Sequence, residues 1–79
     1  MNQNYRTFGE YIKAKRLNDP RELTLKDVSQ KLGMSLSMLS DIEQGRRKAF
    51  DDERILKYCE YLKLDANDLS LMRDLAAKD

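Results

Sequence analysis

The stretch SLSMLSDIEQGRR, residues 35–47, predicts a short helix with a capped start and a glycine stop. Ser35 is the candidate N-cap, because a serine hydroxyl can accept a hydrogen bond from the first turn of a helix. Each residue advances about 100° around the helix axis, so Leu39 and Ile42 point to the core, with Met38 at its edge. The exposed face carries Leu36, Ser37, Ser40, Asp41 and Gln44. The pattern predicts a helix over residues 35–44 with one face in solvent.

The preceding stretch LTLKDVSQKLG, residues 23–33, predicts a second short helix over residues 25–32. Thr24 is its N-cap and Asp27 stands at the acidic position of a capping box, while Leu23 and Val28 can form a hydrophobic staple. Gly33 supplies the left-handed residue that ends a helix. Only residues 33–35 separate the two helices, and this tight, glycine-containing connection predicts a helix-turn-helix arrangement.

Three further helices are predicted on either side of this pair. The first covers about residues 5–18, before the turn at Pro20, and the others cover residues 51–64 and 65–79. Asp51 or Asp52 caps the fourth helix, and Asp65 caps the fifth, where Asp68 repeats the capping-box pattern. The expected apolar faces are Phe8, Tyr11, Ile12 and Leu17 in the first helix; Ile55, Cys59 and Leu62, with Leu56 beside them, in the fourth; and Leu69, Met72 and Leu75 or Ala76 in the fifth. Tyr58 and Tyr61 are expected to be surface or packing residues rather than platforms for stacked bases.

Length and composition limit the class of protein. The chain has 79 residues, of which 41% are hydrophobic and 37% are charged. These values predict a single globular domain over residues 1–79, and the helices predicted above make it an all-α bundle of about five helices. One cysteine and no histidine leave almost no material for a zinc site or for a Ser-His-Asp or Cys-His catalytic pair. We therefore expect no enzyme activity, no metal and no cofactor.

Charge is distributed unevenly along the chain. Residues 1–48 hold ten Lys/Arg and six Asp/Glu, for a net +4, whereas residues 49–79 hold five and eight, for a net −3. Such asymmetry suggests a side that faces a polyanion. No N-terminal apolar run resembles a signal peptide, and no segment approaches membrane-spanning length. We therefore expect a cytoplasmic protein with no membrane partner.

Together these residues resemble a known family. The run KAKRL…LTLKDVSQKLGMSLSMLSDIEQGRRKAF…ILKYCEYLKLD, within about residues 8–64, is similar to the lambda-repressor-like (Cro/XRE-type) helix-turn-helix proteins. The most specific fragments are LTLKDVSQKLGMS and LSDIEQGRR. The resemblance implies a compact bundle of about five helices, with the motif at about residues 24–45. It also implies a partner, double-stranded DNA, and a regulator that is usually homodimeric.

The resemblance assigns site residues as well, with residues 35–44 as the recognition helix. The positions that read base edges match Ser35, Leu36, Ser37 and Asp41. The positions that contact backbone phosphates match Thr24, Leu25, Lys26, Met38, Gln44, Arg46, Arg47 and Lys48. The family also pairs an arginine near the end of the first helix with the glutamate before the loop glycine, which here implies a structural ion pair between Arg16 and Glu43.

Three positions depart from the family pattern. Leu25 stands where a glutamine often bonds a phosphate and supports the first base-reading side chain. Leu36 can pack only on an apolar feature such as a thymine methyl, and Asp41 can either accept from a cytosine amino group or pair with a loop cation such as Arg47. The recognition face offers no Arg or Lys for a bidentate contact with guanine. We therefore expect affinity to rest on phosphate contacts, methyl packing and groove shape.

Two classes of function remain open. The first is sequence-specific binding of double-stranded DNA by a transcriptional regulator, as a homodimeric repressor or as an antitoxin-like protein with a toxin or co-regulator as partner. Its dimer surface would be the last helix or the loop before the fourth. The second is a protein-interaction module on the same scaffold, with weak or no DNA readout, in which Leu36 and Met38 contact a partner chain.

Overall fold

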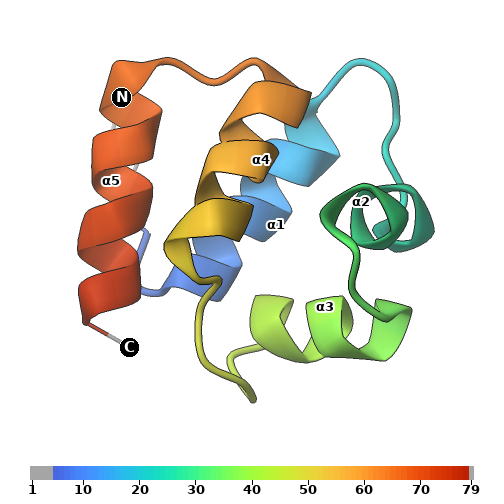
Figure 1. Cartoon of the computed structure of the whole chain (residues 1–79), viewed down its shortest axis with the longest axis horizontal. Coiled ribbons are helices and arrows are strands. Elements are labelled where there is room, and N and C mark those ends of the chain that lie inside the picture. Colours follow the sequence, from blue (N-terminus) through green and yellow to red (C-terminus); the bar gives the residue numbers. More distant parts are fainter. Residues whose placement is uncertain (1–4, 79) are drawn as a thin grey trace.

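The computed structural model describes residues 5–78, which form five helices and no strand (Figure 1). The helices are α1 (Phe8–Asn18), α2 (Leu25–Leu32), α3 (Leu36–Glu43), α4 (Asp52–Leu62) and α5 (Ala66–Ala77). α1 packs against α3 and α5, α2 packs against α3 and α4, and α4 packs against α5. The predicted all-α bundle of five helices is therefore confirmed. None of the described helices has the length and apolar character that a membrane crossing requires.

Side-chain caps set where the helices begin. The Thr7 hydroxyl accepts from the Glu10 N–H at 3.1 Å, so α1 begins at Phe8 and not at residue 5. Thr24 and Asp27 form the predicted capping box of α2, with both hydrogen bonds at 3.0 Å. The Ser35 hydroxyl accepts from the Met38 N–H at 3.1 Å, which confirms the expected start of α3.

The last two helices follow the same chemistry. Asp51, rather than Asp52, caps α4, and Asp65 with Asp68 forms a second capping box at the start of α5. α4 ends at Leu62, two residues before the predicted end, because its C-cap Lys63 adopts a left-handed conformation with φ of 57°. The predicted end of the fifth helix at residue 79 lies outside the described residues, and within them α5 ends at Ala77.

The core is an aliphatic and aromatic cluster enclosed by all five helices. Phe50, in the loop before α4, links the two sides of this cluster: its ring centroid lies 5.0 Å from that of Phe8 and 5.7 Å from that of Tyr58. Tyr58 is fully buried, and its hydroxyl donates to the carbonyl of Ile12. Tyr58 is therefore a packing residue that joins α4 to α1, and burial raises its pKa above the ordinary value.

Leu17, which the apolar pattern assigned to the core, is exposed, and so is Leu56, which was expected beside the buried stripe of the fourth helix. Leu17 is 62% exposed and Leu56 is 46% exposed. Each stands one position, or about 100° of rotation, after a buried residue, Arg16 in α1 and Ile55 in α4. The prediction was wrong for Leu17 because the polar Arg16 occupies the last inward position of α1.

Gly9 allows α1 to lie directly on the backbone of α3. A β-carbon at this position would meet the carbonyl oxygens of Ile42 and Glu43 at 2.3 and 2.6 Å. Real β-carbons essentially never approach other heavy atoms so closely. A side chain at position 9 would push α3 outward, so this glycine fixes the depth at which α3 sits.

Candidate nucleic-acid interface

α3 lies along one edge of the molecule, with the loop of residues 44–51 beyond its C-terminal end (Figure 1). Its inward face is buried at Leu39, Ile42 and Glu43. The outward face leaves Leu36 47% exposed, exposes Ser35, Ser37 and Gln44, and half-buries Met38, Ser40 and Asp41. Of the four residues predicted to read bases, Leu36, Ser37 and Asp41 share the outward side of α3, and Ser35 is exposed at its N-cap.

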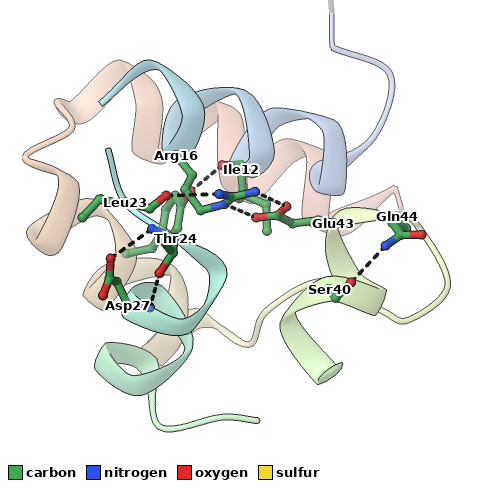
Figure 2. Close-up of polar contacts among 9 residues, drawn as sticks. Ile12, Arg16, Leu23, Thr24, Asp27, Ser40, Glu43 and Gln44 are labelled. Atoms are coloured by element: carbon green, nitrogen blue, oxygen red, sulfur yellow. Dashed lines mark hydrogen bonds and ion pairs between the residues drawn. The ribbon is translucent and has the colours of Figure 1, made fainter. Parts of the chain in front are cut away.

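A buried ion pair fixes the C-terminal end of α3 against α1, as Figure 2 shows. Arg16 donates from Nε to Oε2 of Glu43 at 2.9 Å and from Nη2 to Oε1 at 3.0 Å. Its Nη1 donates to the carbonyl of Leu23 at 3.1 Å, which ties the loop before α2 into the same cluster. The hydrogen bonds to Glu43 raise the pKa of Arg16 above its ordinary value. The predicted pair is present, and it holds both helices of the motif in position.

Arg54 of α4 holds the turn between α2 and α3, a contact that the sequence did not predict. Arg54 donates from Nε to the carbonyl of Leu32 at 3.2 Å and from Nη2 to that of Gly33 at 3.4 Å. These carbonyls are at the end of α2, where a helix lacks internal partners and favours a cation. Gly33 has φ of 69°, as its predicted left-handed role requires. Nothing in the local pattern around Arg54 indicates this contact, because its partners are 21 and 22 residues away.

The acidic residue on the outward face is paired, although not with the cation expected. Asp41 pairs with Arg46 and not with Arg47: its Oδ1 lies 3.2 Å from both Nε and Nη2 of Arg46. The reason is the end of α3, where Gly45 adopts φ of 80° and the Arg46 N–H donates to the Asp41 carbonyl at 2.8 Å. This backbone contact brings the Arg46 side chain next to the Asp41 carboxylate.

A second contact along the same face joins Gln44 to Ser40. The Gln44 amide donates from Nε2 to the Ser40 hydroxyl at 2.9 Å (Figure 2). Both residues lie on the outward side of α3, and Gln44 is exposed. Its amide oxygen accepts no hydrogen bond from the residues that the structure describes, so it can still accept one from an external donor.

Two cations beside α3 remain available to an external anion. Arg47 and Lys48 are exposed, and no carboxylate within residues 5–78 forms an ion pair with either of them. They line a shallow groove of about 260 Å³ together with Met34 and Met38. The loop after α3 therefore presents positive charge next to the outward face of the helix.

The three residues predicted to contact phosphate at the start of α2 differ in how accessible they are. Thr24 and Lys26 are exposed, but the Thr24 hydroxyl already accepts the capping hydrogen bond from Asp27. Leu25 is half-buried against the core. Lys26 is the one charged side chain that the predicted phosphate set places on α2, and no ion pair within the described residues engages it.

Comparison with known proteins agrees with this arrangement. A helix-turn-helix family model matches residues 12–69, which cover most of the chain and all of α2, α3 and α4. No curated protein and no solved structure gives a significant match. The matched family binds DNA and is typically not enzymatic. The chain belongs to the lambda-repressor-like (Cro/XRE-type) helix-turn-helix family.

Proposed function

We propose that this protein is a sequence-specific regulator of transcription that places α3 in the major groove of double-stranded DNA. The observation that carries the proposal is the outward face of α3 together with Arg47 and Lys48, which no described carboxylate neutralises. Base-edge contacts would come from Ser35, Leu36, Ser37 and Asp41. Phosphate contacts would come from Thr24, Leu25, Lys26, Met38, Gln44 and the loop cations Arg46, Arg47 and Lys48.

A dimer would extend the DNA sequence that this small protein can read. A single short helix reads only a few base pairs, and two copies whose helices lie about 34 Å apart reach two half-sites one DNA turn apart. We propose that the protein acts as a homodimer and blocks transcription by occupying such a site. Half-buried Leu69 and Leu71 on α5 support a dimer surface there. Such a role places the protein in the cytoplasm.

Titration of labelled duplexes against salt tests DNA binding, and selection from a random pool tests specificity. If three to five phosphates are neutralised per monomer, the logarithm of the binding constant falls linearly with the logarithm of salt concentration, with a slope of about −0.9 for each phosphate. Selected duplexes should share a pair of related half-sites. Equal affinity for all duplexes would leave DNA binding in place but would refute sequence-specific regulation.

A second candidate function rests on the apolar side chains of the same surface. Leu36 is 47% exposed, and Met34 and Met38 line the adjacent groove. Exposed apolar side chains around a groove suit an apolar segment of a partner protein, such as a toxin or a co-regulator. This function would replace the proposed regulator under two conditions. The protein would bind no duplex at low salt, and a partner protein encoded beside this gene would bind it and bury Leu36.

A further inference from the structure

The side chains of α3 itself provide no guanidinium or ammonium group that could read a guanine. We infer that Arg46, in the loop just after α3, is the guanine reader, and that Asp41 holds it in position. The inference rests on the proposed function, since it names a base contact of the same interface. It also changes the role assigned to each residue, because Arg46 was predicted to contact phosphate and Asp41 to contact a base directly.

The first step is the attachment of Arg46 to the reading face. Its backbone N–H donates to the Asp41 carbonyl at 2.8 Å, and its Nε and Nη2 both lie 3.2 Å from Oδ1 of Asp41. Asp41 lies on the outward side of α3, in line with Ser37. The guanidinium is thus anchored beside the base-reading positions and not at the far end of the loop.

The second step is the set of donors that this contact leaves unused. A guanidinium has five N–H donors; Nε donates to Oδ1 of Asp41, and Nη2 lies 3.2 Å from the same oxygen as the ion pair. Both donors of Nη1 and the outer donor of Nη2 remain, and no other hydrogen bond within residues 5–78 engages them. Nη1 and Nη2 form the end of the fork that donates to O6 and N7 of guanine in a bidentate contact.

The third step is the charge around Arg46, which favours a base edge over a phosphate as its ligand. The Asp41 carboxylate beside Arg46 repels a phosphate and cancels the charge that would attract one. The edge of guanine is uncharged and offers two acceptors, so it tolerates the neighbouring carboxylate. Among residues 5–78 no carboxylate forms an ion pair with Arg47 or Lys48, so we assign the phosphate contacts of this loop to them.

The experiment compares four proteins on duplexes selected by the wild type: wild type, Arg46→Lys, Asp41→Asn and, as the matched control, Arg47→Lys. Lysine keeps the charge but loses the fork. At one selected position the wild type should prefer guanine over adenine by about 5- to 150-fold, which corresponds to one bidentate contact. Arg46→Lys should weaken this preference several-fold, because an ammonium can still donate to O6 or N7 but lacks the planar pair of donors, and it should leave the salt slope unchanged. Arg47→Lys should keep the preference, and Asp41→Asn should reduce it while strengthening binding to every duplex.

Replacing that guanine by 7-deazaguanine, which lacks the N7 acceptor, gives a second readout. It should weaken binding by the wild type more than binding by Arg46→Lys. Equal effects on the two proteins would overturn the inference, as would a guanine preference in Arg46→Lys that is as large as in the wild type. Binding without any base preference would also overturn it, although DNA binding would stand. A wild type that binds no duplex would instead overturn the proposed function, and the inference with it. Thermal unfolding of each variant checks that the helices are intact.

Discussion

Arg16 and Glu43, 27 residues apart in the chain, meet as a buried bidentate ion pair that joins α1 to the last turn of α3. The same guanidinium reaches the Leu23 carbonyl before α2. The pair therefore sets the mutual orientation of the two motif helices, on which any contact by the outward face of α3 depends.

Removing one partner of this pair should destabilise the fold strongly. Glu43→Leu leaves Arg16 buried and uncompensated, and such a loss costs about 3–5 kcal/mol. The double variant Arg16→Met with Glu43→Leu should recover most of that stability, because neither charge is then left alone. Urea unfolding monitored by circular dichroism measures both.

The exposed pair between Asp52 and Arg73 serves as the control, with nitrogen to oxygen at 2.8 Å. Because solvent screens this pair, Arg73→Leu should change the free energy of unfolding far less than Glu43→Leu does. Equal losses for Glu43→Leu and Arg73→Leu would contradict the structural role assigned to the buried pair.

Gly9→Ala should be among the most destabilising single-methyl changes in this protein. The added carbon would meet two backbone oxygens of α3 at 2.3 and 2.6 Å, and backbone atoms cannot move aside as a side-chain tip can. We expect a loss of about 3 kcal/mol, at the upper end of the range for overpacking. Gly33→Ala is the comparison, since a β-carbon there meets nothing within 4 Å. It carries only the backbone cost of a left-handed alanine, about 1 kcal/mol. A smaller loss for Gly9→Ala than for Gly33→Ala would refute the close approach.

Arg47→Ala should weaken binding to all duplexes alike and reduce the salt slope by about 1. The physical reason is the loss of one phosphate neutralised by a cation that has no carboxylate partner among the described residues. Lys57→Ala is a matched control, because Lys57 lies on α4 and lines a different pocket, with Lys31 and Tyr61. Binding measured by fluorescence anisotropy over a salt series separates the two. An unchanged slope for Arg47→Ala would remove this residue from the interface.

Leu36→Ser should change the preference among duplexes without lowering stability. Leu36 is 47% exposed, so its replacement removes little buried area, whereas a thymine methyl would lose its apolar contact. Leu39→Ala, three residues on and fully buried, should cost about 2–5 kcal/mol. Selection from a random pool, paired with thermal unfolding, measures both effects. If Leu36→Ser instead abolishes capture of a protein partner and leaves DNA preference intact, the interaction-module function gains.

The helices could be predicted from local sequence chemistry, whereas the contacts of the candidate site could be predicted only in part. Thr24, Asp27 and Gly33 placed α2 to the residue, because capping and left-handed stops act within a few positions. Phe50 and Arg54 were missed, because their contacts are made across the fold and leave no periodic trace. Asp41 pairs with a loop cation, as one of the two expected alternatives had it, but the cation is Arg46 and not the suggested Arg47, since the turn at Gly45 decides which arginine lies beside α3. The DNA contacts themselves stay predictions, because the contacts of an outward side chain depend on a partner molecule outside the chain.

Asp19 should titrate well below an ordinary aspartate. Hydrogen bonds from the side chain and backbone of Arg21 lower the pKa of Asp19 to about 2. Because the folded-state pKa is below the unfolded one, near 3.9, the stabilisation is fully present above pH 4 or so and is lost as pH falls toward 2. Arg21→Gln should return the pKa of Asp19 toward its ordinary value and flatten the dependence of stability on pH in this window. Arg73→Gln is the control, since Arg73 lowers the pKa of Asp52 and does not contact Asp19. Carboxyl shifts followed by NMR decide the matter: an Asp19 midpoint near 4 in the wild type would show that the contact with Arg21 does not persist in solution.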